Sequence, residues 1–565
     1  MVGIGSSMNR NSMSMALLLT TAALLLATSS AAPEHPSLID RILPNQTLST
    51  PYYGQHVGCA FADLNGDGAM DLIFAAGRHW VDQSYALINL GPEYVDGEDD
   101  DDNREFRGVK FSEALPIGPP GAYYQVDVSP SSSMVGSDVA GSTHRSTVLL
   151  VGGTCHVETS NDFGSCRHGE NTPARVVEVS MSTHEAGGCS VHQPEAECHL
   201  EYADVWEHPN PRGDRNGGFA AFDDGQATMI ALLGQGGIEL FRSNIMMATS
   251  STTDDSQQRQ QVHGQNLLHT SYSSVFHRMP PTKTDPRSDF ARYAGFAAGH
   301  LSSTRGVVAA GRRSDYDAPQ RDDDRNIIGI NELVTFDEED DGERSFLAST
   351  LSPPVASGEP YPGDARYSIQ TTNYAFADVD GDGVQDLLEA TFLYQKQRRP
   401  GYPLPQRVHF LDETGNVKET LVVLEDGEGG DLEDEDAGRS VTTGQIFSDS
   451  TLPDVVFASA EGVVTVFANL GVDGESGEFL GLEQRYELSA GTNECQVRDV
   501  VVTKLAQERQ SGKCWVGIVC AVTCGVEIMG KNHIFYVEGN GTACNGGDGD
   551  LTDLAEGVLL GKIVK

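Results

Sequence analysis

Residues 61–75 read FADLNGDGAMDLIFA, and residues 376–390 read FADVDGDGVQDLLEA. Each stretch has an apolar entry, a loop of the pattern DxxGDGxxD and an apolar exit. Apolar runs on both sides of a short Gly- and Asp-rich loop are typical of two β-strands joined by a turn. Because the two copies lie far apart in the sequence, they indicate a repeated structural unit.

The same strand pattern recurs without the acidic loop in three further segments, residues 218–234, 295–311 and 444–462. A second β-favouring stretch follows several of these units, at residues 85–91, 238–244, 407–415 and 464–471. Two fainter units combine residues 124–127 with 147–152 and residues 497–502 with 515–522. Short strands between Gly, Asn and Asp turns, with almost no helical periodicity, predict an all-β array.

The units number about seven at roughly 60 to 80 residues each, somewhat above the repeat lengths of about 40 to 50 residues known for propellers. Acidic and Ser-rich insertions, such as residues 129–146 and 249–262, explain the excess. We therefore predict an all-β fold, a single β-propeller of about seven four-stranded blades over residues 56–565, with acidic loop insertions. Six or eight blades are alternatives. Two packed β-sandwiches are disfavoured because the repeat continues from about residue 56 to beyond residue 500.

The N-terminal residues 1–31 have the pattern of a signal peptide. The apolar run at residues 16–27 (ALLLTTAALLLA) is too short to span a bilayer, and small residues follow it. We expect cleavage after Ala31, an N-terminal segment at residues 32–55 and a secreted, extracellular protein. No later stretch reaches the roughly 18 apolar residues of a membrane helix, so we expect no membrane span. The chain is expected to be a monomer.

The chain carries a large negative charge, with 82 acidic and 38 basic residues and a formal net charge of -44. Such a chain repels nucleic acid and anionic lipid and attracts cations, so nucleic acid is excluded as a partner. Much of the charge lies in four runs, residues 97–102, 322–324, 337–343 and 425–436. We interpret these runs as solvated loops between strands, and weak calcium buffering is the alternative.

Ten cysteines fall into two clusters, with Cys59 alone. The clusters are Cys155, Cys166, Cys189 and Cys198, and then Cys495, Cys514, Cys520, Cys524 and Cys544. In an exported chain such clusters predict local disulfides, and no pair has the CxxC spacing of a zinc site. The odd cysteine of the second cluster either pairs with Cys59 or stays free. Glycosylation sequons at Asn45 and Asn540 suit the secretory route.

The two acidic loops place oxygen-bearing side chains at positions 1, 3, 5 and 9. These are Asp63, Asn65, Asp67 and Asp71 in the first loop and Asp378, Asp380, Asp382 and Asp386 in the second. Glycines let the backbone close around one point, and the carbonyl at position 7, from Ala69 or Val384, can complete the shell. Oxygen ligands without His or Cys favour Ca2+ over transition metals.

The second loop also fits the EF-hand pattern, because Glu389 stands at position 12. An EF-hand needs a helix on each side, whereas β-strands are predicted on both sides here. The first loop has Phe74 at position 12, where no ligand is possible. We therefore predict a strand–loop–strand site.

At these residues the chain resembles the FG-GAP/VCBS repeat family, which includes the integrin alpha-subunit propeller and secreted propellers of the cartilage acidic protein type. The resemblance is carried by residues 61–75 and 376–390 and by the NLG strand ends at residues 89–91 and 469–471. It implies a propeller, calcium held in loops between strands of a blade, and extracellular recognition. Only two loops keep all their ligands, so the other blades must be stable without metal.

We interpret the chain as an extracellular binding or adhesion module for a glycan or protein ligand, stabilised by calcium. The alternative is a propeller enzyme acting on polysaccharide, of the lyase or glycosidase type. No GxSxG, P-loop or dinucleotide motif is present, and the carboxylates are too many to single out an acid/base pair. An Arg-Gly-Asp tripeptide at residues 212–214 is explained by chance and turn chemistry.

Overall fold

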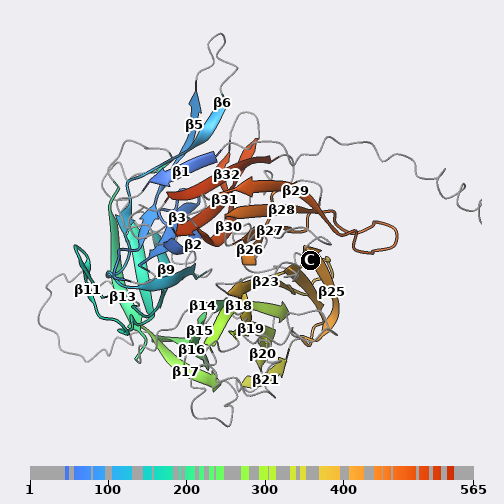
Figure 1. Cartoon of the computed structure of the whole chain (residues 1–565), viewed down its shortest axis with the longest axis horizontal. Coiled ribbons are helices and arrows are strands. Elements are labelled where there is room, and N and C mark those ends of the chain that lie inside the picture. The colour runs from blue at the N-terminus through green and yellow to red at the C-terminus, as the bar shows by residue number, and fades with distance from the viewer. Residues whose placement is uncertain are drawn as a thin grey trace, which may run out of the picture. The chain divides into compact units, whose positions relative to one another are not determined.

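Seven four-stranded sheets, here called blades 1 to 7, follow one another along the chain in the computed structural model (Figure 1). Blade 1 consists of β2 (His56–Ala62), β3 (Asp71–Ala76), β4 (Tyr85–Leu87) and β7 (Leu115–Pro116). Blade 2 consists of β8 (Tyr123–Val128), β9 (His144–Gly152), β12 (Arg175–Met181) and β13 (Leu200–Glu207). Blade 3 consists of β14 (Asn216–Ala221), β15 (Thr228–Gly234), β16 (Gly237–Met246) and β17 (His269–Arg278). Blade 4 consists of β18 (Arg292–Ser302), β19 (Arg305–Arg313), β20 (Asn331–Glu338) and β21 (Arg344–Thr350).

The last three blades follow the same order. Blade 5 consists of β22 (Ser368–Ala377), β23 (Asp386–Tyr394), β24 (Gln406–Leu411) and β25 (Val417–Leu424). Blade 6 consists of β26 (Gly438–Gly444), β27 (Asp454–Ser459), β28 (Val463–Asn469) and β29 (Leu482–Ser489). Blade 7 consists of β30 (Gln496–Gln507), β31 (Cys514–Thr523), β32 (Lys531–Gly539) and β1 (Asn45–Ser49). Two extra hairpins pair β5 (Asn89–Val95) with β6 (Glu105–Phe111) and β10 (Thr159–Asn161) with β11 (Gly164–Cys166).

The structure describes only part of the chain, all of it within Ile42–Lys565, which is one of two units; the other is Met1–Arg41. The described residues are 45–49, 56–77, 80–95, 105–129, 144–155, 158–181, 190–191, 198–209, 216–221, 228–234, 237–246, 269–278, 292–302, 305–313, 331–338, 344–350, 368–394, 406–424, 438–447, 450–459, 462–490, 496–507, 513–523 and 531–539. Over these ranges there is no helix, and therefore no helix long and apolar enough to cross a membrane.

The position of a strand within its blade explains its sequence. Every residue of β3 (DLIFAA) and of β27 (DVVFAS) is buried, because neighbouring blades cover both faces of these second strands. The outer strand β29 (LEQRYELS) instead alternates between buried or half-buried and exposed residues along most of its length. The predicted all-β propeller is thus confirmed, and the number of blades is seven.

The first strands of the seven blades form a closed ring. In chain order β2, β8, β14, β18, β22, β26 and β30 each lie against the next, and β30 lies against β2. Apolar clusters fill the seams between blades 1 and 2, 2 and 3, 3 and 4, 4 and 5, 5 and 6, and 7 and 1. In the remaining seam, β26 and β27 lie against β30. Each blade therefore buries its faces against its neighbours, which is why no repeat unit is self-sufficient.

Blade 7 is completed by the N-terminal strand. Residues 32–55 are predicted to precede the propeller, whereas Asn45–Ser49 pair antiparallel with β32 as the outer strand of this sheet. Figure 1 shows β1 beside β32, strands from opposite ends of the chain. The Gln46 amide donates to the Val109 carbonyl at 3.0 Å, which also attaches β1 to the β5–β6 hairpin of blade 1. The ring is therefore closed by both ends of the chain.

Candidate metal-binding loops

Loop 1 (residues 63–71) joins β2 to β3 and is closed by its own side chains. The Asp63 carboxylate accepts hydrogen bonds from the backbone N–H groups of Gly66 at 2.7 Å and Gly68 at 2.9 Å. The two glycines have φ angles of 76° and 85°, a conformation that other residues rarely adopt. The sequence pattern thus acts locally, because the first aspartate folds the loop around its own carboxylate.

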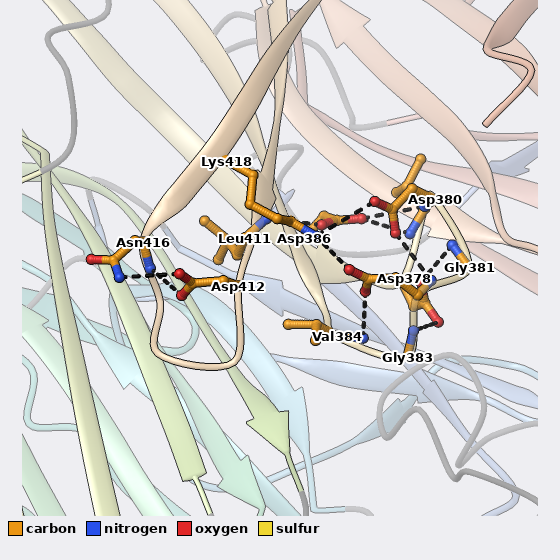
Figure 2. Close-up of polar contacts among 12 residues, drawn as sticks. Asp378, Asp380, Gly381, Gly383, Val384, Asp386, Leu411, Asp412, Asn416 and Lys418 are labelled. Carbon is orange, nitrogen blue, oxygen red and sulfur yellow. Dashed lines mark hydrogen bonds and ion pairs between the residues drawn. The ribbon is translucent and has the colours of Figure 1, made fainter. Parts of the chain in front are cut away.

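Loop 2 (residues 378–386) joins β22 to β23 and repeats this arrangement (Figure 2). Asp378 accepts from the N–H groups of Gly381 at 2.8 Å and Gly383 at 3.0 Å, and these glycines have φ angles of 78° and 87°. One carboxylate oxygen from each of Asp378, Asp380 and Asp382 lies within 4.8 Å of the other two. Three of the predicted ligand side chains are therefore gathered at one point.

Positions 3, 5 and 7 form the same chain of contacts in both loops. The position-3 side chain accepts from the N–H of position 5, at 3.0 Å in loop 1 and 3.1 Å in loop 2. The position-5 carboxylate accepts from the N–H of position 7, at 2.8 Å in both loops. The residues concerned are Asn65, Asp67 and Ala69 in loop 1, and Asp380, Asp382 and Val384 in loop 2.

The aspartate at position 9 is anchored differently, because the backbone bonds both of its oxygens. Asp71 accepts from the N–H of Leu64 at 2.8 Å and of Asn89 at 2.7 Å. Asp386 makes the equivalent contacts at 2.9 Å and 3.1 Å, with donors Val379 and Leu411. Position 9 thus ties loop 2 to the third strand of its blade, β24, and ties loop 1 to Asn89, the first residue of β5.

Blade 6 keeps this anchor without the rest of the loop. Asp454 accepts from the N–H of Ile446 at 2.7 Å and of Asn469 at 2.8 Å. Position 9 therefore has a structural role that needs no metal. Sequence reasoning assigned position 9 only to metal binding, although an Asp directly before an apolar second strand in three blades was a signal for the wider role.

The electrostatics of the loops favour an added positive charge. Burial, followed by the neighbouring Asp380 carboxylate, raises the pKa of Asp386 to about 8. Burial is also the main cause that raises the pKa values of Asp378 and Asp380, with nearby carboxylates adding to it. In loop 1, burial raises the pKa of Asp71 well above its ordinary value. A cation among these groups would oppose both causes, because it stabilises the ionised carboxylates.

The donor set suits a hard divalent cation. The three side chains that converge in loop 2 offer only carboxylate oxygens, and oxygen donors are the ligands of calcium. The flanking elements are the strands β2, β3, β22 and β23, so both loops lie between strands as predicted, and the flanking helices of an EF-hand are not found there.

The two loops have different neighbours at position 5. The Asp67 Oδ2 atom accepts from the backbone N–H of Val191, which belongs to an insertion in blade 2, at 2.8 Å. In loop 2 the ammonium group of Lys418, from the outer strand β25, contacts the Asp382 carboxylate. It also lies 3.8 Å from Asp380 Oδ2, and Figure 2 shows Lys418 beside the loop. A neutral donor thus stands at loop 1 where a cation stands at loop 2.

The asparagines of the two NLG motifs connect neighbouring blades. The Asn89 side chain of blade 1 donates to the Leu505 carbonyl of blade 7 at 2.7 Å. The Asn469 side chain of blade 6 donates to the Val379 carbonyl of loop 2 in blade 5 at 2.8 Å. Each asparagine also accepts from the glycine of its own motif, at 2.9 Å and 2.8 Å. The motif that carried the family resemblance is therefore an inter-blade connection.

The inner strands surround a central channel of about 190 Å³, smaller than the roughly 300 to 1,000 Å³ of small-molecule sites. Two half-buried aspartates line it, and loss of solvation raises the pKa values of Asp127 and Asp499 to about 6. Asp127 accepts from the N–H of Phe219 in blade 3 at 2.7 Å, and Asp499 accepts from that of Cys59 in blade 1 at 3.1 Å. Both carboxyl groups therefore join adjacent blades.

The cysteines follow the predicted clusters in part. Cys155 and Cys166 form a disulfide with each other. Cys198, in the first cluster, and Cys514, in the second, are each disulfide-bonded as well. Cys59 and Cys520 are buried free thiols. Cys59 packs with Val519 and Ala521, so Cys520 between them points to the opposite face of β31. The open choice for Cys59 is thus decided in favour of a free thiol.

Several predicted features lie outside the described residues: residues 1–31, the tripeptide at 212–214, Asn540, and the acidic runs except Asp337 and Glu338. Of the two sequon asparagines, Asn45 is described, and it is exposed at the start of β1.

No known protein family matches the chain, and no curated protein matches it in sequence. Among solved structures, the chain is similar to a protein from Lactobacillus plantarum, with 10% identity over 77% of this chain and 86% of that one and a TM-score of 0.35. It is similar to the alpha-L-arabinofuranosidase Arb93A from Fusarium graminearum, with 9% identity over 74% of this chain and 95% of that one and a TM-score of 0.34. It is also similar to extracellular domains 1–2 of Drosophila semaphorin 1a, with 10% identity over 87% of this chain and 88% of that one and a TM-score of 0.32. Likenesses this weak carry no argument about function.

Proposed function

We propose that this chain is a secreted, calcium-stabilised propeller of the FG-GAP/VCBS type that binds a glycan or protein ligand outside the cell. The observation that supports calcium binding is the pair of matching loops between the first and second strands of blades 1 and 5. The resemblance of these loops to the FG-GAP/VCBS repeat and the signal-peptide pattern support an extracellular binding role.

The loop side chains at positions 1, 3 and 5 and the carbonyl at position 7 would hold calcium, together with position 9. When bound, calcium supplies the positive charge that relieves the repulsion among the carboxylates. Position 9 connects loop 1 to the start of β5 and loop 2 to the end of β24, so the order of each loop is coupled to the strands of its blade. An unfolded chain does not gather these ligands, so calcium at a hundredfold excess over its dissociation constant should stabilise the fold by about 2.7 kcal/mol per site.

Calcium binding is tested by calorimetric titration and by thermal unfolding with calcium or with a chelator. Asp67→Ala and Asp382→Ala should each remove one site, and the double variant should abolish the calcium-dependent rise in melting temperature. Asp473→Ala is a matched control, because this exposed aspartate caps a turn outside both loops. If deletion of residues 426–436 removes the calcium effect while the double variant keeps it, the sites are wrongly assigned.

The binding role is tested on a glycan and protein array at fixed calcium concentration. Retention of a defined ligand, with no turnover across a broad polysaccharide panel, is the expected result. Turnover of a polysaccharide with a bell-shaped pH profile would instead favour the enzyme alternative, because such a profile reports an essential acid and base.

A further inference from the structure

We propose that Lys418 is a built-in counter-cation of loop 2, which competes with calcium there and makes loop 2 the weaker of the two calcium sites. The inference rests on the proposed function and concerns the regulation of the same site. Lys418 contacts the Asp382 carboxylate and lies 3.8 Å from Asp380 Oδ2, so one ammonium group faces two of the predicted ligands.

The position of Lys418 is set by the turn that precedes it. The Asp412 N–H donates to the Asn416 carbonyl at 2.9 Å, and the Asn416 N–H donates back to the Asp412 carboxylate at 2.9 Å. Thr414 adds hydrogen bonds to the same carboxylate from its N–H and its hydroxyl group. Because Lys418 follows Asn416 by two residues at the start of β25, its backbone is held on the side of the blade where loop 2 lies.

Loop 1 provides the comparison within the same chain. Asp67 occupies the position equivalent to Asp382, and its Oδ2 atom accepts from the Val191 N–H at 2.8 Å and from the Asn65 amide at 3.0 Å. Both donors are neutral. Among the described residues, a calcium ion that enters loop 1 therefore meets no ammonium group at this carboxylate, whereas in loop 2 the ion must displace or repel one.

The size of the effect follows from the exposure of the ion pair. The side chains of Lys418 and Asp382 are 39% and 36% exposed, so solvent screens their attraction. Exposed pairs contribute at most about 1 kcal/mol, which corresponds to a change of about fivefold in a dissociation constant. Without calcium, the same ammonium group offsets the mutual repulsion of the three carboxylates.

The test is a calorimetric calcium titration of the full chain. It is made first with wild-type loop 1 and then in the Asp67→Ala variant, in which loop 2 is the one proposed site that is still intact. Lys418→Met keeps the length of the side chain and removes its charge, and it should tighten calcium binding at loop 2 by up to about fivefold. Lys418→Arg keeps the charge and should bind as the wild type does. Lys513→Met removes the ion pair between Lys513 and Glu538 in blade 7, which is 2.8 Å long, and should leave both sites unchanged.

Thermal unfolding gives a second readout. With a chelator present, Lys418→Met should melt below the wild type, and saturating calcium should remove or reverse that difference. If neither the wild type nor Lys418→Met binds calcium at loop 2, the proposed function fails. If loop 2 binds calcium equally well with Lys418 and with Met at this position, the proposed function stands and the role of Lys418 is refuted.

Discussion

Asn469 should be one of the most sensitive positions in the seam between blades 5 and 6. Its side chain is fully buried, donates to the carbonyls of Val379 at 2.8 Å and Pro453 at 3.1 Å, and accepts from the Gly471 N–H at 2.8 Å. Asn469→Ala removes these three hydrogen bonds. At about 1 kcal/mol net for each bond, the free energy of unfolding should fall by about 3 kcal/mol.

The same substitution should also weaken calcium binding at loop 2, because Val379 lies between the predicted ligands Asp378 and Asp380. Stability is measured by urea unfolding and calcium binding by calorimetry. Asn89→Ala is the matched control, because Asn89 makes three equivalent bonds, of 3.1, 2.7 and 2.9 Å, in blade 1 and to blade 7. It should cost the same stability and leave loop 2 unchanged. A loss below about 1 kcal/mol for Asn469→Ala, or equal calcium affinity of loop 2 in both variants, would refute this reasoning.

Other predictions concern pH, packing and processing. The pKa values of Asp127 and Asp499, raised to about 6 by burial, mean that the folded state holds protons that the unfolded chain releases near pH 4. The free energy of unfolding should therefore fall as pH rises from about 4 to 7, by on the order of 3 kcal/mol per group, and Asp499→Asn should flatten this slope in urea titrations. Gly58→Ala would place a Cβ atom 2.8 Å from the inner strand of blade 2 and should lower the free energy of unfolding by about 1 to 3 kcal/mol. Gly474→Ala is the control: its Cβ atom would meet nothing within 4 Å, and it should change the free energy of unfolding by less than about 0.5 kcal/mol in the same assay. N-terminal sequencing of the protein recovered from the medium should start near Ala32, and a cytosolic chain that keeps residues 1–31 would contradict secretion.

The blades could be predicted from sequence because their contacts are local. In blades 3, 4, 5 and 6 the four strands pair in chain order, so apolar runs separated by turn residues suffice to place them. The weak echo at residues 444–462 could be recognised as a repeat unit because its two strands, β26 and β27 of blade 6, pair with each other. The closure of blade 7 by Asn45–Ser49 was missed, because five residues of ordinary composition give no local sign of a partner strand at the other end of the chain.

The candidate site divides in the same way. The sequence alone determined the shape of both loops, because Asp63 and Asp378 bond to glycines only a few residues away and those glycines allow the required φ angles. Only the tertiary structure decided what surrounds the loops: Val191 at loop 1, and Lys418 and Asn469 at loop 2. These residues come from other strands or other blades, and the curvature of the ring and the register of each sheet bring them there. No spacing within the repeat encodes such contacts, because the residues that make them are remote in sequence from the loops they touch.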